Sequence, residues 1–429
     1  MTKLVPANLD AYAQSCRLWA RTCLAAYPHP RAVAASLDEI NAYPQTRRLS
    51  PPRTVQILES RPDRPRLKEL GRAAALAGQI FWEHAAAGEG ARLGLGPKFL
   101  IKPSDLSPQC GQSDQSDLAD LGLGLRRLGR FFFEVDQLAR AAGLEPLTVL
   151  GRQKLLVVAS EDAIDEVAQQ TLAVFGSVAP AANWLFMAQA AFPGLKREAG
   201  QDWEFDLASP HRLHNHGSMA WQKTMDGQLF RRTVNDPTRH YLSQAEFFQL
   251  LTEFVDLVSL NVEDLDYLTQ ALDLETLGLA IELGKKDYGM VMEITANHPE
   301  RPIKGGMCAY DEVLGRDVVI ESFRLQGVQP RDITHLNKNF NHYPHPERVF
   351  SRLARQGLFL PAVVYDDRLY FQPVQGDLNF LVPTAFFTRR TAKAINSLKS
   401  AADIPSALLA MKKQDEDIGY REFMRALGL

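Results

Sequence analysis

The sequence has few cysteines, no strong charge of either sign and no long apolar run. Its four cysteines, Cys16, Cys23, Cys110 and Cys308, are scattered without CxxC spacing, so we expect free thiols in a reducing compartment. A net charge of -3 argues against a general nucleic-acid-binding protein. No apolar run approaches the roughly 18 residues of a membrane span, and the N-terminus lacks a signal-peptide core. We therefore expect a cytoplasmic protein without a nucleic-acid or membrane partner; its oligomeric state stays open.

What is present is the composition of an ordinary globular protein, 429 residues long and 45% hydrophobic. The buried-strand patterns QKLLVVAS and NWLFMAQAAF alternate with helical patterns such as EDAIDEVAQQTLAVFG and LGLGLRRLGRFFFEVDQLARAAG. Alternation of this kind predicts an α/β domain with a mostly parallel sheet flanked by helices. We expect three regions: a helical N-terminal extension over residues 1–75, an α/β catalytic domain over 76–388 and a helical tail over 389–429.

A glycine-rich segment, GEGARLGLGPK, follows the apolar residues 79–87. Glycines allow a backbone to approach a ligand closely, and Arg92 and Lys98 favour a ligand of negative charge. The segment is not a Walker A motif, because the lysine does not directly follow the last glycine. It also has one residue too many for the dinucleotide-binding fingerprint. Its spacing predicts a phosphate-binding loop, with an ordinary turn that carries an incidental basic pair as the alternative.

The pattern GxGxRLGxxPK after a strand resembles the signature loop of sugar-nucleotide pyrophosphorylases, which usually reads GxGTRLG and then PK. Six further segments resemble, in order, those of the eukaryotic-type UDP-sugar pyrophosphorylases: LFMAQAAFP, LHNHGSM, SLNVEDL, RPIKGGMCAY, VVIESFRL and THLNKNF. The resemblance implies a Rossmann-like nucleotidyltransferase fold of the GT-A type, with a mixed sheet. It also implies transfer of uridylate from UTP to a sugar-1-phosphate with Mg²⁺, releasing pyrophosphate.

The resemblance also implies a role for each matching residue. Catalysis would fall to Arg92, which can fork onto phosphate oxygens, and to Lys98, which supplies a point charge. The nucleotide would be bound by Ala87, Gly88, Gly90, Gln189, His216 and Gly217. The sugar phosphate would be bound by Lys304, Gly305, Gly306, Glu321, Asn337 and Asn339, and the metal by Glu263 and Asp264.

Each role has a plainer alternative. The amide of Gln189 can donate and accept at once, which suits the edge of uracil, but it is also an ordinary amide at a strand end. Glu263 and Asp264 offer the oxygens that Mg²⁺ prefers, or they form a solvated turn or a helix cap. The two asparagines suit sugar hydroxyls or turn capping, and Lys304 suits the sugar phosphate or the surface.

The sequence departs from the family pattern at several positions. Ala91 stands where threonine is usual, and Ala87 where glycine is common. In the metal turn, glutamate and aspartate replace the usual aspartate and asparagine. Thr384, in LVPTAFF, stands where we place the family's late catalytic lysine. The changed metal turn and Thr384 motivate an alternative function, a catalytically impaired protein that binds sugar nucleotides.

Six of the ten histidines lie in two short segments, HRLHNHG and HLNKNFNHYPHP. His211, His214 and His216 suit a zinc or other transition-metal site by residue type, although no cysteine lies near them. A histidine metalloenzyme is therefore a second alternative. The sequence does not indicate which sugar is used.

Overall fold

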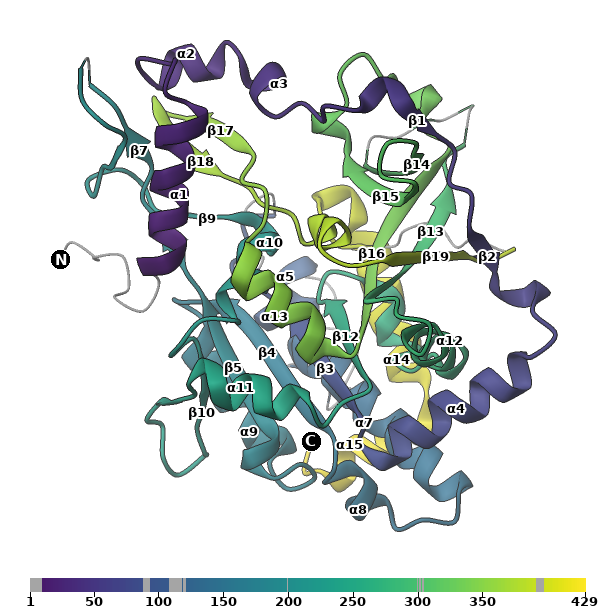
Figure 1. Cartoon of the computed structure of the whole chain (residues 1–429). Helices are drawn as coiled ribbons and strands as arrows, with labels where there is room; N and C mark the ends of the chain where they lie inside the picture. Colours follow the sequence, from purple (N-terminus) through teal and green to yellow (C-terminus); the bar gives the residue numbers. More distant parts are fainter. Residues whose placement is uncertain are drawn as a thin grey trace.

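The computed structural model describes residues 10–87, 93–107, 118, 121–198, 200–298, 300, 302, 305–390 and 397–429, without the side chains of 339 and 340. It shows a large sheet flanked by helices (Figure 1), which confirms the predicted α/β fold. No helix in the described ranges has the length and hydropathy needed to cross a membrane.

The helices and strands follow the chain in this order. The α-helices are α1 (Asp10–Cys23), α2 (Pro30–Ala34), α3 (Leu37–Ile40), α4 (Arg64–Ala77), α5 (Pro103–Leu106), α7 (Leu123–Ala141), α8 (Pro146–Leu150), α9 (Ile164–Phe175), α10 (Asn215–Gln222), α11 (Gln244–Leu251), α12 (Leu274–Gly284), α13 (Pro346–Gln356), α14 (Ile404–Glu416) and α15 (Ile418–Ala426). Short 3-10 helices are η2 (Thr46–Arg48), η3 (Leu58–Ser60), η4 (Lys98–Leu100), η5 (Ala181–Asn183), η6 (Leu265–Leu268), η7 (Ser322–Arg324), η8 (Pro330–Asp332), η9 (Gln375–Phe380) and η10 (Ala401–Asp403). The strands are β1 (Leu49–Ser50), β2 (Val55–Ile57), β3 (Ile80–Ala85), β4 (Lys154–Ser160), β5 (Trp184–Gln189), β6 (Ala191–Phe192), β7 (Leu195–Lys196), β8 (Glu204–Phe205), β9 (Arg212–Leu213), β10 (Leu229–Arg231), β11 (His240–Tyr241), β12 (Asp256–Asn261), β13 (Met290–Ala296), β14 (Gly306–Asp311), β15 (Arg316–Glu321), β16 (His335–Pro344), β17 (Ala362–Tyr365), β18 (Arg368–Phe371) and β19 (Thr384–Thr388).

The main sheet has the order β11-β10-β5-β4-β3-β12-β16-β13-β19-β2. Strands β5, β4, β3 and β12 are parallel, as are β13, β19 and β2. Strand β16 runs antiparallel between β12 and β13, so the sheet is mixed. The central strands are apolar over nearly their whole length because helices cover both faces of the sheet.

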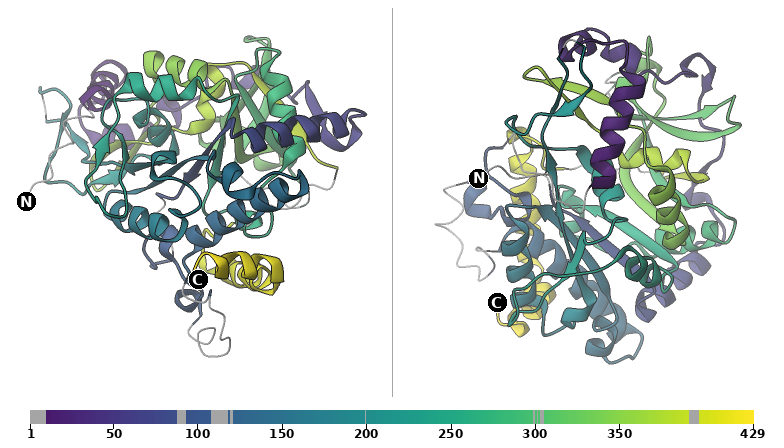
Figure 2. Two further views of the ribbon diagram at one scale, coloured as in Figure 1. Left: turned by 90° about the horizontal axis from the view of Figure 1, so that it is seen from below. Right: turned by 60° about the vertical axis from the view of Figure 1, so that its left-hand side comes forward.

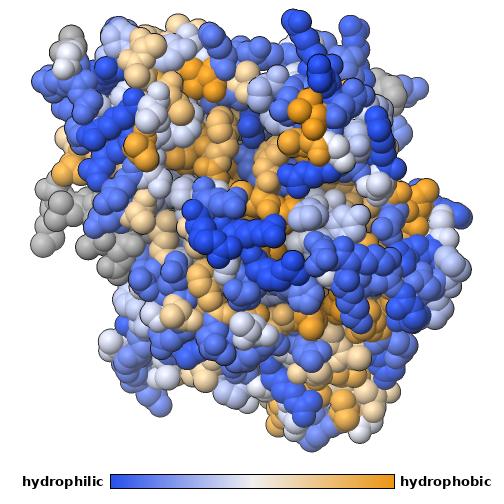
Figure 3. Space-filling view, in the orientation of Figure 1, coloured by the Kyte–Doolittle hydropathy of each residue, from blue (hydrophilic) through white to orange (hydrophobic). Residues whose placement is uncertain are grey.

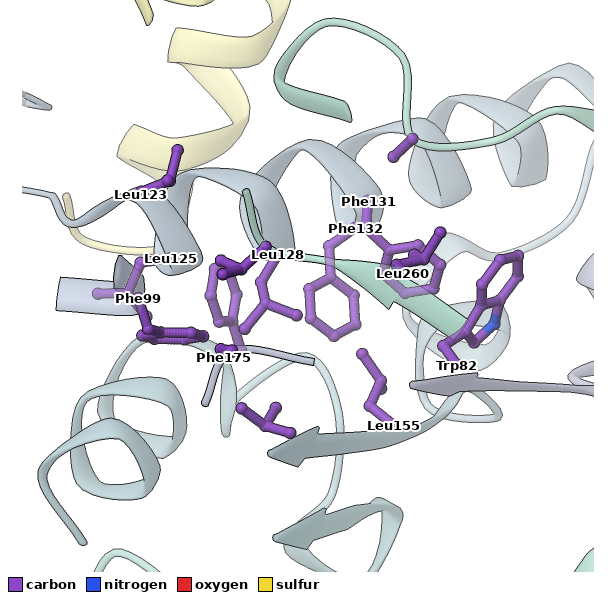
Figure 4. Close-up of a cluster of buried hydrophobic side chains, with 14 of the residues drawn as sticks. Trp82, Phe99, Leu123, Leu125, Leu128, Phe131, Phe132, Leu155, Phe175 and Leu260 are labelled. Atoms are coloured by element: carbon purple, nitrogen blue, oxygen red, sulfur yellow. The ribbon is translucent and has the colours of Figure 1, made fainter. Parts of the chain in front are cut away.

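The two faces of the sheet carry separate hydrophobic cores. On one face, α7 places Phe131 and Phe132 against Trp82 of β3 and Leu155 of β4 (Figure 4). The C-terminal helices α14 and α15 extend this core outside α7 (Figure 2). The other core joins α1, α10, α11 and α13 to the small strands β6–β8, β17 and β18. On the outer surface seen in Figure 3, hydrophilic residues cover most of the face and apolar residues appear among them in small groups.

The sequence predicts a helical N-terminal segment, but the observed segment is not purely helical. It contains α1–α4, but β1 pairs with β14, and β2 forms the edge of the main sheet beside β19. The segment over residues 368–383 is a strand only at β18 and then turns into η9. The helical tail is present as α14 and α15. The domain boundaries near residues 75 and 388 stay predictions.

Candidate functional site

The predicted site residues lie mainly at one edge of the sheet, where β3, β5 and β12 end. Side chains that follow the carboxyl ends of parallel strands meet at such an edge, which is where α/β proteins bind ligands. Ala87, beyond the end of β3, is buried there. Gly88, Gly90 and Arg92 lie outside the described residues, so their roles stay predictions.

Lys98 begins η4, just after the glycine-rich segment. Its position is fixed by the residues that follow: Phe99 is buried against the start of α7, and the amide of Leu123 donates to the carbonyl of Ile101 at 2.8 Å. The Lys98 side chain is only 9% exposed, and its Nζ lies 2.5 Å from Oε2 of Glu263. The predicted phosphate-binding lysine and the predicted metal-turn acid therefore meet.

A second lysine reaches the same carboxylate from the C-terminal tail. Nζ of Lys399 lies 3.3 Å from Oε1 of Glu263. The backbone of the tail holds it there, because the amide of Leu398 donates to the carbonyl of Glu263 at 2.8 Å and Ser397 forms a β-bridge with Asp264. Sequence reasoning missed Lys399, since nothing in NSLKSAAD distinguishes it from a surface lysine before a helix.

Thr384, in contrast, lies away from this edge. It begins β19 and is paired with Met290, which begins the parallel strand β13. Its hydroxyl donates to the carbonyl of Val382 at 3.4 Å. Because parallel strands begin at the edge opposite the one where they end, Thr384 does not occupy a place beside Glu263. The lysine of the C-terminal segment that does lie beside Glu263 is Lys399.

The predicted nucleotide residues come together around the first turn of α10. Nε2 of Gln189 donates to the carbonyl of Asn215 at 3.0 Å and to Oγ of Ser218 at 3.2 Å. His216 accepts a hydrogen bond at Nδ1 from the amide of Gln375, at 2.8 Å. Burial lowers the pKa of His216 to about 4. The ring is therefore neutral at pH 7 and carries its proton on Nε2, which makes that nitrogen a donor.

The residue after His216 has to be a glycine. A Cβ on Gly217 would lie 2.4 Å from the backbone carbon of Pro373. The amide of Gly217 also donates to the carbonyl of Pro373 at 3.0 Å. The start of α10 is thus pressed against the chain segment that precedes η9, and a larger residue at this position would push the two apart.

A series of buried polar contacts holds the side chain of Gln375. Its side-chain amide donates to Oγ of Ser259 at 3.4 Å, and that hydroxyl donates to Oε1 of Glu83 at 2.7 Å. Glu83 is in turn paired with Lys223, and both side chains are fully buried. Breaking one member of a buried ion pair is costly because the other charge stays unpaired. This series of contacts therefore fixes the strand and turn residues that pack near His216.

The predicted sugar-binding residues meet on β14, β15 and β16. Gly306 is the register partner of Glu321, and a Cβ on Gly306 would lie 2.7 Å from Oδ1 of Asn337. Burial raises the pKa of Glu321, and the nearby positive charges of Arg324 and Lys399 oppose the shift. Lys399 thus links this group to Glu263. Gly305 precedes β14, Asn339 lies within β16 with its side chain undescribed, and Lys304 falls outside the described residues.

Glu263 and Asp264, the predicted metal pair, have different surroundings. Asp264 caps η6, accepting a hydrogen bond from the amide of Asp266 at 3.1 Å. It lines a cavity of about 240 Å³ together with Glu293 and Lys338. Burial raises the pKa of Asp264 to about 6, against the effect of the Arg127 charge. The capping role that the sequence left open is thus observed for Asp264, whereas Glu263 faces the two lysines.

The three clustered histidines do not form a metal site. His214 bonds Tyr12 and His216 bonds Gln375, each through Nδ1. Over the described ranges, no group of three or more His, Cys, Asp or Glu side chains has the arrangement of a metal site. The structure therefore gives no support to a histidine metalloenzyme.

Comparison with known proteins identifies the fold. No protein-family model and no curated protein matches the sequence. Solved structures do match: a uridine diphosphate N-acetylglucosamine pyrophosphorylase from Trypanosoma brucei aligns with TM-score 0.60 and 14% identity over 99% of this chain and 86% of its own. A UDP-glucose phosphorylase from the same organism gives TM-score 0.54 and 14% identity over 94% and 78%. A variant of UDP-glucose pyrophosphorylase from Leishmania major, in complex with UDP-glucose, gives 0.53 and 12% over 94% and 79%. The chain has the fold of these UDP-sugar pyrophosphorylases, as the sequence resemblance predicts.

Proposed function

We propose that this chain is a uridylyltransferase that forms a UDP-sugar and pyrophosphate from UTP and a sugar-1-phosphate. The observation that carries the proposal is the cluster of Lys98, Glu263 and Lys399 at the carboxyl edge of a sheet with the pyrophosphorylase fold. Two lysines and one carboxylate suit a triphosphate, whose negative charge has to be neutralised during transfer.

The reaction is attack of a sugar-phosphate oxygen on the α-phosphorus of UTP, with pyrophosphate leaving on the opposite side. Little covalent chemistry is asked of the protein, so its residues act by positioning and by charge. Lys98 and Lys399 leave their ion pairs with Glu263 and neutralise phosphate oxygens of UTP. Nε2–H of His216 donates to an acceptor of the nucleotide, and Gln189 contacts the base. Glu321 and Asn337 offer acceptors and donors to the sugar hydroxyls.

The carboxylate of Glu263 fits a magnesium ion, because Mg²⁺ is commonly held by one or two carboxylates together with substrate phosphates. Glu263 would hold the ion, which would supply positive charge to the triphosphate. Asp264 contributes by capping η6, and so holds the turn in place.

The enzymatic interpretation is favoured over a protein that only binds sugar nucleotides. That alternative was motivated by Thr384 and by the altered metal turn. Thr384 lies at the opposite edge of the sheet, Lys399 supplies a cation, and Glu263 keeps a carboxylate in the turn. The positions of Lys399 and Glu263 therefore support the enzymatic interpretation.

The test is pyrophosphate release from UTP, Mg²⁺ and a panel of sugar-1-phosphates. We expect release with at least one sugar and a loss of about one to two orders of magnitude in Lys98→Ala, because a charge-assisted hydrogen bond contributes about 1.5–3 kcal/mol. Lys285→Ala, at an exposed lysine beyond α12, is the matched control and should behave as wild type. Binding of a UDP-sugar without release from any sugar would favour the binding protein instead.

A further inference from the structure

The turn that carries the nucleotide residues is strained. Asn215 has a φ of +33°, in the left-handed region that residues with side chains rarely adopt. His216 and Gly217 follow it directly, and Gln189 donates to its carbonyl. Strained backbone persists only where the surrounding structure holds it in place. Contacts from the surrounding structure must therefore hold the turn His214–Asn215 in place.

The N-terminal helix α1 provides one such hold. The hydroxyl of Tyr12 lies 2.8 Å from Nδ1 of His214, and both residues are buried. Among the described residues, Nε2 of His214 has no hydrogen-bond partner, so Tyr12 makes the hydrogen bond described for this ring. Tyr12 itself is fixed by Phe192, at 4.9 Å between ring centroids, and by the edge of Trp221, at 5.3 Å.

We infer that Tyr12 is a positioning residue for the nucleotide. Its hydroxyl holds His214, and through it the strained Asn215, so that Nε2–H of His216 and Oε1 of Gln189 are available to the bound nucleotide. The inference rests on the proposed function, which places UTP at this turn. It adds a residue about 200 positions away in sequence, on a segment expected from the sequence to lie outside the catalytic domain.

Tyr12 acts on the nucleotide side of the site and not on the lysine cluster. Removing its hydroxyl leaves a buried ring nitrogen of His214 unpaired, which favours relaxation of the turn. Lys98, Glu263 and Lys399 share no contact with Tyr12 among the described residues. The loss should thus appear as weaker UTP binding and a higher KM, with kcat little changed.

The experiment is calorimetric titration of UTP with Mg²⁺ into wild type, Tyr12→Phe and Tyr420→Phe. Tyr420 is the matched control: it is equally buried, and its hydroxyl donates to the carbonyl of Arg126 at 3.3 Å, on the tail side of the molecule. We expect Tyr12→Phe to bind UTP about three- to tenfold more weakly, and Tyr420→Phe to bind as wild type does.

The outcomes separate this inference from the proposed function. Wild type that binds no UTP overturns both. Wild-type binding with an unchanged Tyr12→Phe overturns the inference alone, and so does an equal loss in the two tyrosine variants, which would reflect general destabilisation.

A double-mutant cycle with Asn215→Gly tests the role of strain. Glycine adopts a φ of +33° without strain, so the turn then needs less support. We expect Tyr12→Phe to weaken UTP binding less in the Asn215→Gly background than in wild type. Equal losses in both backgrounds would mean that Tyr12 does not act through the strained turn.

Discussion

The two ends of the chain reach the same site in different ways. The N-terminal helix α1 places a neutral hydroxyl, that of Tyr12, against His214 beneath the nucleotide side. The tail places a charged group, Lys399, against the carboxylate of Glu263. Under the proposed function, one end therefore shapes the backbone that presents ligand-binding groups, and the other adds charge where phosphate is expected. Changes at the first should alter binding, and changes at the second should alter the rate.

The two ends are also attached by different interactions. Helix α1 is held mainly by burial, because Tyr12, Cys16 and Ala20 are almost completely buried. The tail is also buried, at Met411, Tyr420 and Met424. In addition it makes charged contacts to α7, with Arg126 at 2.7 Å from Asp415 and Arg130 at 2.7 Å from Asp417. The ends should therefore respond differently to acid and to charge removal.

The largest expected effect is that of acid. Burial lowers the pKa of His84 and His214 to about 3 and that of His216 to about 4. These values lie below the ordinary pKa of histidine, about 6.5. Between the lowered and the ordinary pKa, the unfolded chain therefore binds more protons than the folded chain does. The stability that these histidines contribute is thus complete above about pH 6.5. It is lost as pH falls towards about 4 for His216 and about 3 for His84 and His214, by about 1.4 kcal/mol per pH unit for each histidine.

Thermal unfolding and hydrogen exchange at about pH 7.5 and about pH 5 check this prediction. The melting temperature should fall, and exchange should rise more in α1, which covers His214, than in α14, which covers none of the three histidines. An unchanged melting temperature would contradict the burial of neutral histidines. Equal exchange in α1 and α14 would remove the difference between the two ends.

The next effect is that of the tail lysine. Lys399→Ala should lower kcat about 10- to 100-fold, because a charge-assisted hydrogen bond to phosphate contributes about 1.5–3 kcal/mol, and should change KM for UTP less. Lys399→Arg keeps the charge and should recover part of the rate. Steady-state kinetics of pyrophosphate release measure both. Lys412→Ala removes an exposed lysine from α14 on the same tail and serves as the control; a similar loss there would indicate a general effect of the tail.

Much of the fold was predictable because its patterns are local. The continuous apolar run of β4, the amphipathic helix α9 and the long helix α7 each express their burial within a few residues of sequence. The strand-end positions of two predicted site residues follow from the same local patterns. Gln189 ends β5, and Glu263 follows β12, so their position at the sheet edge follows from the strands themselves.

The rest depends on contacts between distant segments. Strand β2 is only three residues long and gains its place by pairing with β19, more than 300 positions later. Lys399 reaches Glu263 because Ser397 and Leu398 pair with the metal turn, a contact that no local pattern shows. Thr384 was associated with the site by the similarity of its segment, and the strand register places it at the other edge. The similarity of a sequence segment can identify the corresponding segment of a family without showing where its side chains lie in the structure.

The smallest expected effect tests how the N-terminal helix is held. Arg21 of α1 is paired with Glu204, but the two side chains are 43% and 52% exposed. Exposed ion pairs contribute about 0–1 kcal/mol, because water and salt screen them. Arg21→Ala should therefore change the free energy of unfolding by less than about 1 kcal/mol, as measured by urea denaturation, and leave UTP binding unchanged. A larger loss of stability, or weaker UTP binding, would mean that charge attaches this end as it does the tail, and the two ends would no longer differ in kind.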